Sequence, residues 1–139
     1  MENESCQNRL TILLADEPGG SSATVCRLLE PLGVQTLVAR TGQEALDLVR
    51  SQLVHVVVLD VQMPQLGGLQ VLRLMRGMTK TPPPAILLAD RLSNNLLLEA
   101  LTMNVFSVMP KPVELNRLLD SIARVVRRHY ESRWPVGRN

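Results

Sequence analysis

Five short apolar runs, separated by segments in which apolar residues recur at helical spacing, constrain the fold of this 139-residue chain more than any other feature. A short apolar run bounded by turn residues predicts a strand that is covered on both faces. Regular alternation of such strands with helices predicts a parallel sheet joined by right-handed crossovers. We therefore expect an α/β fold with strands at residues 10–15, 34–39, 54–59, 85–89 and 105–109.

The segments between these runs carry the start and stop signals of helices. The first predicted helix ends at Gly33, and Pro31 is expected to shorten or bend its last turn. Thr41 and Glu44 predict a capping box at the start of the second helix. The remaining helices are predicted after the turn at Gly67-Gly68, over 92–103 with Ser93 or Asn94 as the cap, and from 115 to about 131.

The length of the chain indicates one domain with a core of its own. The expected arrangement is a doubly wound, five-stranded parallel sheet of strand order 2-1-3-4-5, with helices on both faces. We expect the folded domain to cover residues 9–131, between a flexible leader at 1–8 and a flexible tail at 132–139.

Composition excludes several classes of protein. The formal charge of +2 is too small to predict nucleic-acid binding from the overall balance. Cys6 and Cys26 have neither metal-ligand spacing nor a disulfide framework, which favours a reducing compartment. The chain shows no signal peptide, and no apolar run approaches the roughly 18 residues of a membrane span. We expect a cytoplasmic protein that does not enter the membrane.

Acidic residues mark the point where the first and third predicted strands end. Asp16 and Glu17 follow the first strand, and Asp60 closes the central one. The strand order places these two strand ends side by side, at the edge where open α/β sheets bind ligands. Lys111, just after the fifth strand, is expected to close the site from the other side. Carboxylate oxygens with water are the ligands that suit Mg²⁺, so we predict a magnesium site.

The combination of Asp16-Glu17, Asp60 within DVQMPQLGG, and Lys111-Pro112 resembles the receiver domain of two-component response regulators, over roughly residues 9–130. The resemblance implies a flavodoxin-like (βα)5 fold. It also implies that Asp60 is the phosphoacceptor, which takes a phosphoryl group from a histidine kinase or a phosphotransfer protein.

The same resemblance implies a role for the other site residues. Asp16, Glu17, Asp60 and the backbone carbonyl of Gln62 would hold Mg²⁺, directly or through water. Lys111 would contact the phosphoryl group, and a cis peptide bond before Pro112 would aim its ammonium group into the cleft. Mg²⁺ and Lys111 together could neutralise the oxygens of the phosphoryl group during transfer.

Two positions depart from the family pattern. Receiver domains carry a Ser or Thr hydroxyl at the end of the fourth strand, where this chain has Ala89, or Asp90 in a register shifted by one. They also carry an aromatic residue in the fifth strand, where this chain has Val108, with Phe106 offset by two. Because both residues that couple phosphorylation to the output surface are missing, we expect a weak conformational response.

The expected output surface comprises the fourth helix, the fifth strand and the fifth helix. Leu96, Leu97 and Leu98 cannot all point inward from one helical turn, so one is expected to be exposed. This face is the expected contact for an effector protein or for a second copy. The basic residues of the last helix are interpreted as a solvated face, and nucleic acid is not an expected partner.

These features favour a single-domain response regulator that acts through protein contacts. One alternative is a pseudo-receiver, an interaction module of the same fold that works without phosphorylation. A second is a small phosphoaspartyl-type enzyme, but such enzymes need a general acid two residues after the nucleophile, where this chain has Gln62. The chain is not expected to be an enzyme, beyond a capacity to catalyse its own phosphorylation and dephosphorylation.

Overall fold

The computed structural model of the chain describes residues 9–16, 20 and 22–130. The expected leader at 1–8 and tail at 132–139 lie outside the described residues, as does Glu17, so the predicted domain boundaries stay a prediction. The sheet has five parallel strands in the order β2-β1-β3-β4-β5, which confirms the predicted topology. The strands are β1 (Thr11–Ala15), β2 (Gln35–Ala39), β3 (Val56–Asp60), β4 (Ala85–Ala89) and β5 (Ser107–Pro110).

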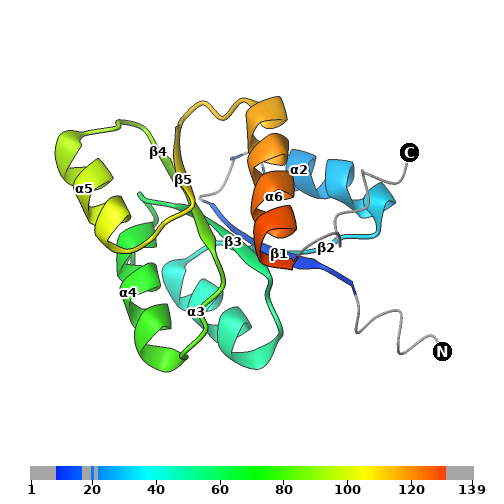
Figure 1. Cartoon of the computed structure of the whole chain (residues 1–139), viewed down its shortest axis with the longest axis horizontal. Helices are drawn as coiled ribbons and strands as arrows, with labels where there is room; N and C mark the ends of the chain where they lie inside the picture. The colour runs from blue at the N-terminus through cyan, green and yellow to red at the C-terminus, as the bar shows by residue number, and fades with distance from the viewer. Residues whose placement is uncertain (1–8, 17–19, 21, 131–139) are drawn as a thin grey trace.

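Helices cover both faces of the sheet (Figure 1). On one side α2 and α6 pack against the strands, and on the other side lie α3, α4 and α5. The helices are α2 (Ser22–Leu29), with the 3-10 turn η1 (Glu30–Leu32) after it, α3 (Gly42–Ser51), α4 (Gly68–Met78), α5 (Asn94–Thr102) and α6 (Leu115–Tyr130). Within the described residues, we find no helix that has both the length and the apolar character needed to cross a membrane.

The predicted helix ends are largely confirmed. The last turn before Gly33 narrows to the 3-10 turn that contains Pro31, and Gly33 has a φ of 82°, which favours glycine. At the start of α3, Thr41 Oγ1 accepts a hydrogen bond of 3.1 Å from the backbone N–H of Glu44. Glu44 Oε1 reaches back to the N–H of Arg40, one residue before the position that a capping box would use.

Two strands begin two residues later than predicted. Before β3, Thr11 donates its backbone N–H to the Nδ1 of His55 over 3.0 Å, so a side chain takes the place of a backbone partner. Before β5, the N–H of Val105 bonds to the carbonyl of Ala100 in α5 and completes the end of that helix. In both cases a hydrogen bond outside the regular sheet ladder accompanies the later start of the strand.

The core consists of two apolar layers, one on each face of the sheet. In β1, Ile12 and Leu14 belong to the layer beneath α2 and α6, whereas Leu13 belongs to the layer beneath α3, α4 and α5. Both faces of the strands are therefore buried, which explains why they are almost continuously apolar in sequence. Because the strands are held between two apolar layers, their carboxyl ends have fixed positions, and so do Asp16 and Asp60 at those ends.

Candidate functional site

Asp16 and Asp60 lie at the carboxyl ends of the neighbouring strands β1 and β3. The two strands pair in parallel with Ala15 opposite Leu59, so the next residue of each strand reaches the same edge of the sheet. Asp60 is fully buried, and Asp16 is also buried. The predicted meeting of acidic residues at this edge is therefore present for the two residues that the structure describes.

Both carboxylate oxygens of Asp60 accept hydrogen bonds. Lys111 Nζ lies 2.6 Å from Oδ2, and the backbone N–H of Gln62 donates to Oδ1 over 2.9 Å. A buried carboxylate is tolerated when it is paired and hydrogen-bonded in this way. A carboxylate held in this way can serve as a nucleophile or as a cation ligand.

The backbone around Lys111 holds its side chain in the site. Its N–H donates to the carbonyl of Ala89 at the end of β4, over 2.8 Å. The peptide bond between Lys111 and Pro112 is cis, as the resemblance to receiver domains implies. Lys111 Nζ also lies 3.6 Å from Oδ1 of the exposed Asp90, so two carboxylates share this ammonium group.

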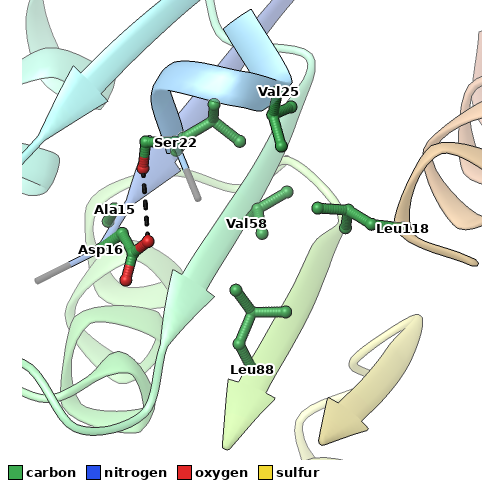
Figure 2. A pocket seen from close by; sticks show the side chains of 8 residues that line it. Ala15, Asp16, Ser22, Val25, Val58, Leu88 and Leu118 are labelled. Atoms are coloured by element: carbon green, nitrogen blue, oxygen red, sulfur yellow. Dashed lines mark hydrogen bonds between the residues drawn. The ribbon is translucent and has the colours of Figure 1, made fainter. Parts of the chain in front are cut away.

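Asp16 is positioned by two residues that the sequence reasoning missed. Ser22 Oγ lies 3.5 Å from Asp16 Oδ2, and Figure 2 shows the hydroxyl directed at the carboxylate. A Cβ atom on Gly20 would overlap with the same carboxylate, so only glycine allows this approach of the backbone. A glycine and a serine shortly after an acid pair are the signals that could have pointed to these roles.

A narrow cavity of about 10 Å³ lies beside Asp16, with apolar side chains around it (Figure 2). Val25, Val58, Leu88 and Leu118 bring these side chains from α2, β3, β4 and α6. A buried water needs at least about 10–15 Å³ and several polar partners, so the cavity has room for one water at most. These apolar side chains limit the access of water to Asp16 from the cavity. A ligand would therefore reach Asp16 from the edge of the sheet.

The donor set at this edge fits a hard divalent cation. Asp16 and Asp60 supply carboxylate oxygens, and the backbone of Gln62 lies beside Asp60 through its hydrogen bond. Glu17, the third predicted acid, lies outside the described residues. Among residues 9–16, 20 and 22–130, no three His, Cys, Asp or Glu side chains gather as a metal site.

The two positions that depart from the family pattern lie where the sequence placed them. Ala89 is the last residue of β4 and is buried, whereas Asp90 lies beyond the strand. Val108 pairs with Leu87 and packs in the layer beneath α3, α4 and α5. Phe106 packs against the opposite layer, so its ring does not replace the missing aromatic residue beside Val108.

The exposed apolar surface of α5 is larger than predicted. Leu96 is buried, but both Leu97 and Leu98 are exposed, at 41% and 61%, where the sequence reasoning expected one exposed leucine. Leu96 and Ala100, one turn apart, are the buried residues of this helix. Its outer stripe therefore remains available for contact with another protein.

Comparison with known proteins gives one consistent family. The model of the response regulator receiver domain matches residues 12–123. The response regulator MprA of Mycolicibacterium vanbaalenii is 35% identical over 117 residues, which cover 84% of this chain and 50% of that protein. A protein-glutamate methylesterase/protein-glutamine glutaminase 2 of Rhodopseudomonas palustris is 35% identical over 130 residues, covering 85% of this chain and 34% of the relative.

The solved structures agree with the sequence comparison. The receiver domain of the Francisella response regulator 1452 superposes with a TM-score of 0.77 at 27% identity, and the match covers 86% of this chain and 98% of that one. The chain spans about half the length of MprA and about a third of the methylesterase. The similarity to both relatives therefore concerns this domain, and the catalytic activity in the name of the second belongs to a longer protein.

Proposed function

Because this chain belongs to the family of response regulator receiver domains, which act in two-component signal transduction, we propose that Asp60 is the residue that accepts the phosphoryl group. The observation that carries the proposal is the buried pair of Asp60 and Lys111, with 2.6 Å between Oδ2 and Nζ. Receiver domains typically signal without an enzymatic activity of their own, and they interact with histidine kinases or effectors in general.

The proposed reaction is an in-line transfer from a phosphohistidine. A carboxylate oxygen of Asp60 attacks the phosphorus atom, the P–O bond forms, and the P–N bond breaks with its electron pair returning to the imidazole nitrogen. Such transfer depends on positioning and on neutralising the phosphoryl oxygens. Lys111 is already held beside the carboxylate by the backbone hydrogen bond to Ala89, so its charge needs little rearrangement.

Receiver domains generally bind Mg²⁺ at their acidic phosphorylation site. We assign the ion here to Asp16, Glu17, Asp60 and the backbone carbonyl of Gln62. When bound, Mg²⁺ would neutralise charge on the phosphoryl oxygens. The support from this chain is the pair of buried carboxylates at adjacent strand ends and the close approach of Gly20, which holds one of them in place.

The proposed output is a protein contact that responds weakly to phosphorylation. Ala89 has no hydroxyl with which to follow the phosphoryl group, and Val108 has no ring to reorient. The proposed contact surface is the outer side of α5 with β5 and α6, where Leu97 and Leu98 are exposed. Its partner is an effector protein or a second copy of the chain. The expected location is the cytoplasm, and the proposed domain boundaries are residues 9–131.

The proposed function is tested by incubation with acetyl phosphate and Mg²⁺, followed by intact-mass measurement. The native chain should gain the mass of one phosphoryl group, and Asp60→Asn should gain none. Asp90→Asn is the matched control, because it removes the other carboxylate near Lys111 and should leave the adduct in place. An unmodified native chain, or an adduct that persists in Asp60→Asn, would contradict the proposal.

A pseudo-receiver is the second candidate. Ala89 and Val108 favour it, because they replace the hydroxyl and the aromatic residue that would transmit phosphorylation to the output surface. It predicts partner binding with no adduct from any donor, which the same measurement distinguishes. The enzyme alternative has less support. The Gln62 side chain is an amide, whose N–H groups donate hydrogen bonds but do not ionise near neutral pH, so it cannot act as a general acid, although the backbone N–H of Gln62 does contact Asp60.

A further inference from the structure

A groove of about 800 Å³ lies at the edge of the sheet opposite to Asp60. It is formed where the loop 79–84 enters β4, where Phe106 precedes β5, and where the chain leaves α4, α5 and α6. In a parallel sheet the amino ends of the strands share one edge, so the groove and the phosphoacceptor site face away from each other. The groove therefore lies apart from the proposed site, and Leu97 and Leu98 of the proposed contact surface are not among its lining residues.

Three cations line the groove, and none is neutralised by the residues that the structure describes. Arg76, Lys80 and Arg128 are exposed, and the groove lining contains no carboxylate. Arg73, one turn before Arg76 in α4, is by contrast paired, with 2.6 Å between its Nη2 and Oε2 of Glu99. No described carboxylate comes within ion-pairing distance of the three groove cations.

Helix ends reduce this positive charge but do not cancel it. Arg76 and Arg128 lie in the last turns of α4 and α6, where the macrodipole carries about half a negative elementary charge per helix. The three positive side-chain charges exceed the combined negative charge at the ends of α4 and α6, even if the end of α5 is added. Lys80 lies beyond the end of α4. The groove therefore keeps a net positive potential at neutral pH.

The floor of the groove is apolar and partly rigid. Leu72, Met103 and Phe106 line it together with the consecutive prolines 82–84. Met103 and Phe106 are only half-buried, so they offer apolar surface to a ligand. The volume is in the range of about 300–1,000 Å³ that is typical of ligand sites. The unbranched side chain of Met103 can adapt its shape to different ligands.

We propose that this groove binds an acidic peptide segment with interspersed apolar side chains, presented by a partner protein. The cations would pair with its carboxylates, and the floor around Phe106 would take its apolar residues. Single-stranded nucleic acid fits less well, because its bases need aromatic platforms and this floor is mainly leucine, methionine and proline. Because the groove is at the opposite edge from Asp60, binding should not require phosphorylation.

The test is a selection of random peptides displayed on phage against the native chain. Counter-selection uses the variant Arg76→Gln/Lys80→Gln/Arg128→Gln, which removes exposed charges only. The control variant Arg27→Gln/Arg117→Gln/Arg124→Gln has the same change in net charge and lies outside the groove. Selected peptides are then synthesised in three forms, with the native sequence, with acids changed to amides, and with apolar residues changed to serine.

We expect the selection to enrich acidic sequences that contain apolar residues. The groove variant should weaken their binding about ten-fold, while the control variant, Leu97→Ser/Leu98→Ser and Asp60→Asn should each bind as the native chain does. Both altered peptide forms should bind more weakly. Failure to enrich such peptides would overturn the proposal, as would equal binding by the groove variant.

Two further outcomes would assign the groove to another occupant and overturn the proposal. One is tighter binding of a single-stranded oligonucleotide than of any selected peptide, with the loss confined to the groove variant. The other is self-association of the native chain that the groove variant abolishes. The test does not depend on phosphorylation, so failure of the Asp60 proposal would leave its result unchanged.

Discussion

Lys111 Nζ lies 2.6 Å from Oδ2 of Asp60, a carboxylate with no exposure to solvent, and the two residues are separated by 51 positions in the chain. This contact joins the ends of β3 and β5 across β4. It offsets part of the negative charge of the site before any phosphoryl group or cation arrives. The free energy of unfolding therefore depends on whether Asp60 keeps its ion pair with Lys111.

Lys111→Met should lower the free energy of unfolding by about 3 kcal/mol, because it leaves a buried carboxylate without its counter-charge. Urea unfolding measures the change. The double variant Lys111→Met/Asp60→Asn should recover most of the loss, since an amide needs no counter-charge. A double variant as unstable as Lys111→Met alone would show that the pair is not coupled.

Gly20→Ala should displace the carboxylate of Asp16, because the added methyl group would occupy its position. Under the proposed function, Mg²⁺ affinity should fall about ten-fold or more, as measured by calorimetric titration. Gly77→Ala is the matched control. Gly77 is an exposed position of α4 and nothing lies near its added Cβ, so the variant should keep Mg²⁺ affinity and gain up to about 1 kcal/mol of stability. Unchanged affinity in Gly20→Ala would remove Asp16 from the metal site.

Tyr130→Phe should cost about 1 kcal/mol of stability without changing phosphorylation. The Tyr130 hydroxyl donates to the carbonyl of His55 over 2.7 Å, which ties the end of α6 to the amino end of β3. Phenylalanine keeps the edge-to-face ring contact with His55, whose centroid lies 5.1 Å away. Urea unfolding gives the stability, and intact mass gives the phosphorylation rate. A slower rate would show that the two edges of the sheet are coupled.

Ala89→Thr should strengthen the response of the output surface to phosphorylation. A hydrogen bond to a charged group contributes roughly 1.5–3 kcal/mol, enough to shift a two-state population about ten-fold to a hundred-fold. The measurement compares amide spectra of residues 90–112 with and without a bound phosphoryl mimic. The native chain should show small shifts on this surface, and its partner affinity should change less than about ten-fold. Large shifts in the native chain would mean that another route carries the signal.

The fold could be predicted because its strands are buried on both faces and so leave a clear apolar signal. The range of β4 matched the prediction, and Asp60 was correctly placed at the end of the central strand. The start of β3 was not predictable, because the side chain of His55 replaces a backbone partner of Thr11. Hydrogen bonds of this kind depend on residues that are distant in sequence.

The site was predicted less completely than the fold. Strand order alone brings Asp16 and Asp60 to one edge, so their meeting follows from topology. The role of Gly20 depends on how closely one loop passes a carboxylate, which no sequence spacing specifies. The groove was missed for a similar reason, because Arg76 of α4 and Arg128 of α6 come from opposite faces of the sheet and line one groove only in the folded chain.

The identity of the phosphoacceptor can be measured by trapping the modified residue. After reaction with acetyl phosphate and Mg²⁺, borohydride reduces an aspartyl phosphate to homoserine, and peptide mass spectrometry locates the change. Homoserine should appear at position 60 in the native chain and nowhere in Asp60→Asn. Homoserine at position 16 in place of 60, or none in a chain that carries the phosphoryl mass, would contradict the assignment of Asp60.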